Sequence, residues 1–289
     1  MAAVPAPVPQ HDSDPVEERI YGGIGEEILV RTWRPPASAR GIVVICHGLK
    51  SHSGYYGWAA SQLTGEGLIV YAFDLHGRGK SAGDRYFAYE VEEYARDVDA
   101  VVTLAQARHP GLPTFLLGHS AGGVVATVYA LEYHARLAGL ISESLAFRVA
   151  APDFALAVVK GISHVAPHLH VLRLKNEDFS RDPDVVRRMN EDPLIKDEVE
   201  PAQTIAALVR ADERLKAEFP ELTLPVLILH GTADRVTNPS GSRYFFEHTG
   251  SQDKTLKLYE GHVHDLLNDV GKEQVMGDIV GWLRPRLAS

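Results

Sequence analysis

The chain has 289 residues, of which 45% are hydrophobic and 23% charged, and its formal net charge at pH 7 is −9. This composition is that of a soluble globular protein long enough for one large domain with an insertion, and the acidic charge argues against a nucleic-acid partner. No apolar run reaches the roughly 18 residues of a membrane helix, and the N-terminus lacks the pattern of a secretory signal, so we expect a soluble, cytoplasmic protein.

A loose lead-in rich in proline and alanine is expected at residues 1–17, and the chain beyond it alternates between strand and helix patterns. Apolar runs bounded by Gly, Pro or Asp predict strands at 27–33, 41–46, 68–73, 114–118, 137–142 and 225–230. A more alternating pattern at 255–260 predicts a strand at the edge of the sheet. Apolar residues at three- and four-residue spacing predict helices at 91–109, 121–137 and 273–287. Strands that alternate with helices predict an α/β fold with a mostly parallel sheet covered on both faces.

The alternation stops at 146–220, where no strand is predicted. This segment contains partly amphipathic and charged, proline-punctuated stretches, followed by a helical pattern at 202–219. We expect it to form a helical cap, or lid, inserted between the core segments 18–145 and 221–289. Such an insertion would cover the carboxyl ends of the strands, where open α/β sheets bind ligands.

A single serine stands between the predicted strand at 114–118 and the predicted helix at 121–137. The local sequence Gly118-His119-Ser120-Ala121-Gly122 fits G-x-S-x-G, the nucleophile elbow. Small neighbours leave room for a sharp turn that exposes the hydroxyl, and the helix directs its N-terminal amides at the site. We therefore interpret Ser120 as a nucleophile rather than as part of a packing turn.

A serine nucleophile needs a base and a carboxylate that orients the base, and the elbow predicts the chain order Ser, Asp or Glu, His. Asp234 comes just after the strand predicted at 225–230, and it is the candidate carboxylate. His262 and His264 both follow the last predicted strand. The position along the chain does not distinguish between these two histidines as the base.

The oxyanion that develops during attack needs two backbone N–H donors. One is expected from Ala121, directly after the nucleophile, and the other from Leu49, in the loop after the strand predicted at 41–46. His47 lies in the same loop, and we expect it to brace the turn by hydrogen bonding rather than to act as a base.

Six stretches of the sequence, over about residues 18–285, resemble serine α/β-hydrolases of the monoacylglycerol lipase and lysophospholipase type. They are CHGLKSHSGYY (46–56), FDLHGRGKSAGDR (73–85), GHSAGG (118–123), SRDPDVV with NEDPL (180–194), HGTADRVTNPSGS (230–242) and YEGHVH (259–264). The resemblance implies an α/β-hydrolase fold, with a mostly parallel eight-stranded sheet, flanking helices and a helical cap. It also implies hydrolysis of single-acyl-chain esters through an acyl-enzyme, with no metal and no cofactor. Because YEGHVH is similar to the family's Y-x-G-x-x-H, whose last histidine is the base, it favours His264, with His262 lining the pocket.

The sequence departs from this family at several positions. The common H-G-x-x-E-H-S-G-R-Y is H-G-L-K-S-H-S-G-Y-Y here, so that Ser51 and Tyr55 replace an acidic and a basic residue. In monoacylglycerol lipases those polar groups help to shape the end of the site that receives glycerol, and their loss argues against a glycerol-specific site. Ala121 replaces the usual methionine after the nucleophile, and His76 and Arg78 are exchanged relative to the commoner R-G-H-G.

Candidate substrate-binding residues come from the loop after 41–46, from the cap and from the last loop. They are Ser51, His52, Tyr55, Tyr56, Phe154, Val158, Ile162 and His262. An apolar cap face would suit an acyl chain, because each buried methylene contributes roughly 0.8 kcal/mol.

A carboxylesterase for short-chain, aromatic or xenobiotic esters, without glycerol specificity, is the alternative, because Tyr55, Tyr56 and Trp58 could form an aromatic wall. A ligand-binding module without turnover is the rival of a different kind, and the intact serine, aspartate and histidine set argues against it. The expected partner is a small-molecule acyl ester. An exposed apolar cap would allow at most transient contact with a membrane surface, and the chain is expected to be a monomer or a homodimer.

Overall fold

The computed structural model describes residues 14–147 and 153–288, and the side chains of 153–156 lie outside the description. Its main sheet has eight strands in the order β1-β2-β4-β3-β5-β6-β9-β10. The strands are β1 (Val16–Tyr21), β2 (Glu27–Trp33), β3 (Gly41–Cys46), β4 (Leu68–Phe73), β5 (Thr114–His119), β6 (Gly139–Glu143), β9 (Val226–Gly231) and β10 (Lys254–Tyr259). β2 pairs antiparallel with β1 and β4, and the other pairs are parallel. The predicted mostly parallel, eight-stranded α/β-hydrolase sheet is confirmed.

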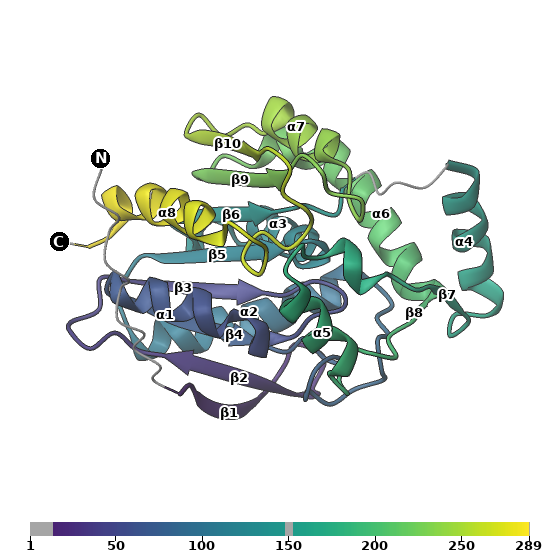
Figure 1. Cartoon of the computed structure of the whole chain (residues 1–289), viewed down its shortest axis with the longest axis horizontal. Coiled ribbons are helices and arrows are strands. Elements are labelled where there is room, and N and C mark those ends of the chain that lie inside the picture. Colours follow the sequence, from purple (N-terminus) through teal and green to yellow (C-terminus); the bar gives the residue numbers. More distant parts are fainter. Residues whose placement is uncertain (1–13, 148–152, 289) are drawn as a thin grey trace.

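Helices cover both faces of this sheet (Figure 1). The α-helices are α1 (Gly57–Gly65), α2 (Val91–Arg108), α3 (Ala121–Glu132), α4 (Asp153–Val165), α5 (Pro183–Glu191), α6 (Ala202–Glu218), α7 (Pro239–His248) and α8 (Lys272–Leu283). In β3, Ile42 and Val44 belong to the core cluster that includes residues of α2 and α3, while Val43 and Ile45 belong to the cluster with α1 and α8. Because successive side chains of a strand point to opposite faces, a continuous apolar run is what a strand buried on both faces requires.

Short 3₁₀ helices complete the described chain. They are η1 (Ser53–Tyr56), η2 (His134–Arg136), η3 (Asn176–Asp178), η4 (Phe219–Glu221) and η5 (Arg284–Arg286). No helix in the described part of the chain is both long and apolar enough to cross a bilayer.

The first strand was not expected from the sequence. Residues 1–17 are predicted as a loose lead-in, but β1 already begins at Val16. Its sequence, VEERIY, is half polar and mostly exposed, because β1 is an edge strand held by its ladder with β2 rather than by burial. The hydrophobic pattern on which the prediction rests is therefore absent.

The segment 146–220 contains α4, α5 and α6, and also a short antiparallel pair, β7 (His170–Leu172) with β8 (Glu200–Pro201). The prediction that this segment contains no strand is wrong, because strands of two or three residues are too short to show a period. Figure 1 shows these elements on the side to which the parallel strands point. α6 also packs into the main core through Ile205, Ala207, Ala211 and Leu215.

Candidate active site

The turn between β5 and α3 holds Ser120 in a conformation that side chains rarely adopt. Its φ is +56° and its ψ is −122°. A Cβ on Gly118 would lie 2.4 Å from the carbonyl oxygen of Gly122, and a Cβ on Gly122 would lie 2.3 Å from the carbonyl oxygens of Cys46 and His47. The two glycines are therefore required for the close approach of backbone segments that supports this turn.

Ser120 lies at one end of a chain of short hydrogen bonds. Its Oγ is 2.8 Å from Nε2 of His264, and Nδ1 of His264 is 2.7 Å from Oδ2 of Asp234. Asp234 comes from the loop after β9 and His264 from the loop after β10, and both side chains are fully buried. In this arrangement His264 can accept the hydroxyl proton while the carboxylate orients and stabilises the imidazolium.

The carboxylate of Asp234 is held from both sides. Oδ1 accepts hydrogen bonds from the N–H groups of Val236 (2.8 Å) and Thr237 (3.0 Å), and Oδ2 accepts from the Thr237 hydroxyl (2.8 Å). Asp234 therefore shapes its own loop, as an Asx turn does, and also faces His264. Burial alone would raise the pKa of Asp234, but His264 and His230 hold it well below its usual range, so the carboxylate stays ionised.

His230 is a neighbour of this site that the sequence reasoning missed. Its Nε2 is 3.0 Å from Oδ2 of Asp234, and its Nδ1 is 2.7 Å from the hydroxyl of Ser242. A histidine at the end of the apolar run 225–230 carries no periodic or motif signal that separates it from a packing residue. Its role depends on the fold of the loop after β9.

The second histidine near the last strand makes different contacts. His262 packs against Tyr259, and its Nδ1 is 3.9 Å from Oδ2 of Asp269. Burial and the nearby Arg181 lower the pKa of His262. The hydrogen bonds to Ser120 and Asp234 are made by His264, in agreement with the choice that the resemblance favours.

The loop after β3 lies against the elbow. Leu49 and Ala121 both line the cavity that reaches Ser120, and Ala121 is the first residue of α3, where N–H groups have no partner within the helix. His47 braces this loop as expected: its Nδ1 is 2.7 Å from the carbonyl oxygen of Gly48, and its Nε2 accepts the N–H of Leu75 at 3.1 Å. Burial lowers the pKa of His47 to about 4, so it stays neutral.

A cavity of about 370 Å³ leads to Ser120, and its walls are mostly apolar. The lining residues are Leu49, Ser120, Ala121, Ala146, Val159, Val171, Leu172, Arg173, Leu174, Lys175, Asp178, Ile205, Leu208, Val209, Asp212, Arg235, Val236 and Thr237. Much of this wall comes from α4, α6 and the segment 171–178, all within the predicted cap.

The predicted substrate-binding residues do not line this cavity. Ser51, His52, Tyr55, Tyr56, Val158, Ile162 and His262 are absent from its wall, and the side chain of Phe154 lies outside the described residues. In α4 the wall is formed by Val159, whereas Val158, one position earlier, is 54% exposed. The sequence shows that α4 is amphipathic, but the cavity wall is set by the way the helix packs.

The loop residues are instead used to hold other parts of the chain. His52 Nε2 is 2.9 Å from Oδ2 of Asp192, and the Tyr55 hydroxyl donates to the same oxygen at 3.1 Å. Ser51 and Tyr56 are buried. Asp192, which follows α5, thus contacts two of the residues that were predicted to bind substrate.

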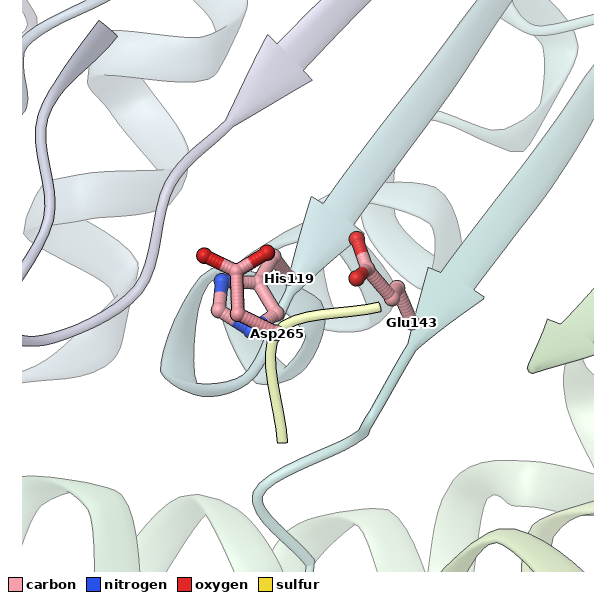
Figure 2. A group of neighbouring side chains, drawn as sticks. All are labelled: His119, Glu143 and Asp265. Carbon is pink, nitrogen blue, oxygen red and sulfur yellow. The ribbon is translucent and has the colours of Figure 1, made fainter. Parts of the chain in front are cut away.

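His119, Glu143 and Asp265 form a buried group beside His264 (Figure 2). Each offers one ligand atom, and these atoms lie within 4.8 Å of one another, so this is the set among the described residues that could hold a metal ion. Nε2 of His119 and Oε2 of Glu143 are buried without a hydrogen-bond partner. Burial, followed by the charge of Asp265, raises the pKa of Glu143 well above its usual range, and burial raises the pKa of Asp265 to about 6. With these raised pKa values, the two neighbouring carboxyl groups hold a proton more readily than isolated ones do.

The stability of the protein should respond to this group. An aspartate whose pKa is higher in the folded state than in the unfolded state contributes stability that is complete at low pH and lost as pH rises through about 6. We expect the Tm of the wild type to fall between pH 5 and pH 8, and the fall to be a few degrees smaller in Asp265→Asn. Asp184→Asn removes an exposed carboxylate and serves as the control. If Tm falls equally with pH in the wild type and in Asp265→Asn, the pH dependence of stability does not come from Asp265.

Comparisons with known proteins agree with the fold. The family model described as serine aminopeptidase, S33, matches residues 37–271 of the chain. A monoacylglycerol lipase of Mycolicibacterium smegmatis is 32% identical over 269 residues, covering 92% of this chain and 96% of the relative. A human monoglyceride lipase is 34% identical over 270 residues, covering 92% of this chain and 89% of the relative. The crystal structure of Paleococcus ferrophilus monoacylglycerol lipase superposes with a TM-score of 0.80 at 34% identity, covering 89% of this chain and 99% of the other.

Proposed function

Because this chain belongs to the family described as serine aminopeptidase, S33, and is a serine ester hydrolase similar to monoacylglycerol lipases, we propose that it cleaves esters of a single acyl chain through an acyl-enzyme. The observation that carries the proposal is the hydrogen-bond chain from Ser120 through His264 to Asp234, which lies at an apolar cavity. This geometry matches what acyl transfer needs, and a cavity of this composition matches an acyl chain.

In the proposed reaction Ser120 Oγ attacks the ester carbonyl carbon while His264 Nε2 takes its proton. The N–H groups of Leu49 and Ala121 stabilise the negative charge on the carbonyl oxygen. His264 then protonates the leaving alcohol, and the acyl group stays on Ser120. Water attacks this acyl-enzyme by the same sequence, and the carboxylic acid and free Ser120 are restored.

The acyl chain is proposed to lie along the apolar wall. Its candidate contacts are Val159, Val171, Leu174, Ile205, Leu208 and Val209. Each methylene removed from water adds roughly 0.8 kcal/mol of binding free energy, so that several methylenes outweigh any single polar contact to the alcohol. Chain length should therefore be the main determinant of specificity.

The family's description includes peptidases, but the cavity gives little support to a site for a free α-amine. Such a site needs uncompensated negative charge. Asp178 and Asp212 line the cavity, but so do Arg173, Lys175 and Arg235.

One observation favours a second candidate, a carboxylesterase without glycerol specificity. His52 and Tyr55 both form hydrogen bonds with Asp192. In addition, Ser51 and Tyr55 replace the acidic and basic residues that shape the glycerol end in monoacylglycerol lipases. An aromatic ester has less support, because Tyr55, Tyr56 and Trp58 lie outside the cavity wall.

The exposed apolar residues of the cap segment indicate how the protein could meet its substrate and a second subunit. We propose that the substrate is met as a small molecule or by transient contact with a lipid surface, since Val158, Val165 and Leu169 of the cap segment are exposed. The same residues would also serve in a homodimer. A cytoplasmic location stays a prediction from the sequence.

The experiment compares kcat/KM for a long-chain monoacylglycerol with a p-nitrophenyl ester series from acetyl to palmitoyl, using Ser120→Ala as the blank. We expect kcat/KM to rise with chain length beyond butyryl and the monoacylglycerol to be cleaved at a comparable rate. An optimum at acetyl to butyryl with no monoacylglycerol hydrolysis would favour the second candidate. Absence of any ester hydrolysis above the blank would overturn the proposed function.

A further inference from the structure

The loop that supplies the Leu49 amide is tied to the cap segment at its next residue. Lys50 has a φ of +54°, its N–H donates to Oε1 of Glu198 at 2.6 Å, and its Nζ donates to the carbonyl oxygen of Ile195 at 2.8 Å. Lys50 and Glu198 are both buried and lie 148 residues apart in sequence. The left-handed conformation of Lys50 is thus accompanied by two hydrogen bonds to the segment that follows α5.

Glu198 is itself fixed by a buried arginine. Nη1 of Arg78 is 3.1 Å from Oε1 of Glu198, and Arg78 also donates to both carboxylate oxygens of Glu200, at 3.0 and 2.8 Å. All three side chains are at most 2% exposed. In the stretch FDLHGRGKS, the arginine at position 78 faces the two glutamates, and His76 pairs with Asp97 at 2.6 Å.

The desolvation of these buried charges offsets most of their mutual attraction, so the cluster adds little net stability. Burial, followed by the charge of Glu200, raises the pKa of Glu198 well above its usual range. Whether Glu198 is protonated or ionised, Oε1 can still accept the N–H of Lys50. The hydrogen bond to the loop is therefore available in either state.

The other side of the loop is fixed within the core. Nε2 of His47 accepts the N–H of Leu75, and a Cβ on Gly48 would lie 2.8 Å from Cβ of Ser120, so this part of the loop has little room to move. Leu49 lies between this fixed part and Lys50. Glu198 fixes the peptide unit that joins Leu49 to Lys50, and this unit is connected through the φ and ψ angles of Leu49 to the peptide unit that carries the Leu49 N–H.

We propose that Glu198 is a positioning residue that aims the Leu49 amide at the oxyanion, and that this contact couples the cap segment to turnover. The proposal rests on the proposed function, in which the Leu49 amide stabilises the oxyanion. Small displacements of such donors matter, because a donor acts only when it points at the developing charge.

The test uses two matched substitutions in the purified full-length chain. Glu198→Leu and Glu200→Leu each leave Arg78 with one glutamate partner, but only Glu198→Leu removes the acceptor of the Lys50 N–H. With p-nitrophenyl butyrate, Glu198→Leu is expected to lower kcat by about 10- to 100-fold with KM within about twofold, since removal of an entire oxyanion donor costs about 10²- to 10³-fold. Glu200→Leu should keep kcat within about threefold, and Glu198→Gln, which retains Oε1, should recover most of the loss.

A second readout separates positioning from stability. The rate constant for inactivation by a fluorophosphonate, whose phosphoryl oxygen uses the same donors, should fall in Glu198→Leu in parallel with kcat, while Tm is measured for each variant. If Glu198→Leu does not fold, Glu198→Met takes its place. Unchanged kcat in Glu198→Leu, or equal losses in both leucine variants that follow Tm, would overturn the inference. Failure of the proposed function would appear differently, as no ester turnover in the wild type.

Discussion

Replacing Ser120 with alanine is expected to lower kcat/KM for ester hydrolysis by about 10⁴-fold or more, because no other group in the proposed mechanism can form the acyl-enzyme. The midpoint of thermal unfolding should change little. The substitution removes one hydroxyl, and alanine meets the same backbone strain at a φ of +56° as serine does. The measurement is the hydrolysis of p-nitrophenyl butyrate together with a thermal melt.

Ser144→Ala is the matched control for this variant. Ser144 is also a buried serine with a positive φ, +47°, and it follows β6 as Ser120 follows β5. Its hydroxyl has no hydrogen-bond partner, so we expect activity close to that of the wild type. Substantial hydrolysis by Ser120→Ala would remove the elbow assignment, and a comparable loss in Ser144→Ala would show that the kinetic effect comes from the backbone rather than from the nucleophile.

His264→Ala should lower kcat by about 10⁴-fold or more, whereas His262→Ala should cost less than about tenfold. His264 joins Ser120 to Asp234 through both ring nitrogens, whereas His262 contacts Tyr259 and lies near Asp269. The two histidines are close in sequence and follow the same strand, so each variant is a control for the other. Kinetics at several pH values would check the result, since the remaining activity of His264→Ala should lose the pH dependence that its base imposes. The reverse order of the two losses would make His262 the base.

The sequence alone predicts those site residues that directly follow a strand of the sheet. Ser120, Asp234 and His264 each follow an apolar run, and the carboxyl ends of parallel strands meet at one edge of a sheet. The structure brings the three side chains into one hydrogen-bond chain, and their catalytic roles stay predictions until the variants are measured. The resemblance was needed to separate His264 from His262, because two positions in one loop differ only in the direction that the loop gives to each side chain.

Long-range pairing explains most of what the sequence did not show. The contact between Lys50 and Glu198 joins positions 148 residues apart, and no local pattern marks either residue. His230 lies only four residues before Asp234, but it reaches that side chain because the loop after β9 turns back on its strand. These partnerships exist in the folded chain alone.

The cap segment was predicted less well than the core for a related reason. An amphipathic helix such as α4 presents a wide apolar face, so that the sequence could not separate Val158, which is exposed, from Val159, which lines the cavity. Tyr55 is predicted to bind substrate because its position helps to shape the glycerol end in the family that the sequence resembles, and His52 lies in the same stretch. Asp192, 140 and 137 residues further along the chain, engages both of them instead.

The most direct test of the account locates the nucleophile itself. The wild-type chain would be treated with a fluorophosphonate, digested, and examined by mass spectrometry, with Ser120→Ala treated in parallel. If Ser120 is the nucleophile, one covalent adduct is expected, on the peptide that contains Ser120, and none in Ser120→Ala. An adduct on another residue, or none in a folded wild-type chain, would contradict the claim that this protein is a hydrolase acting through Ser120.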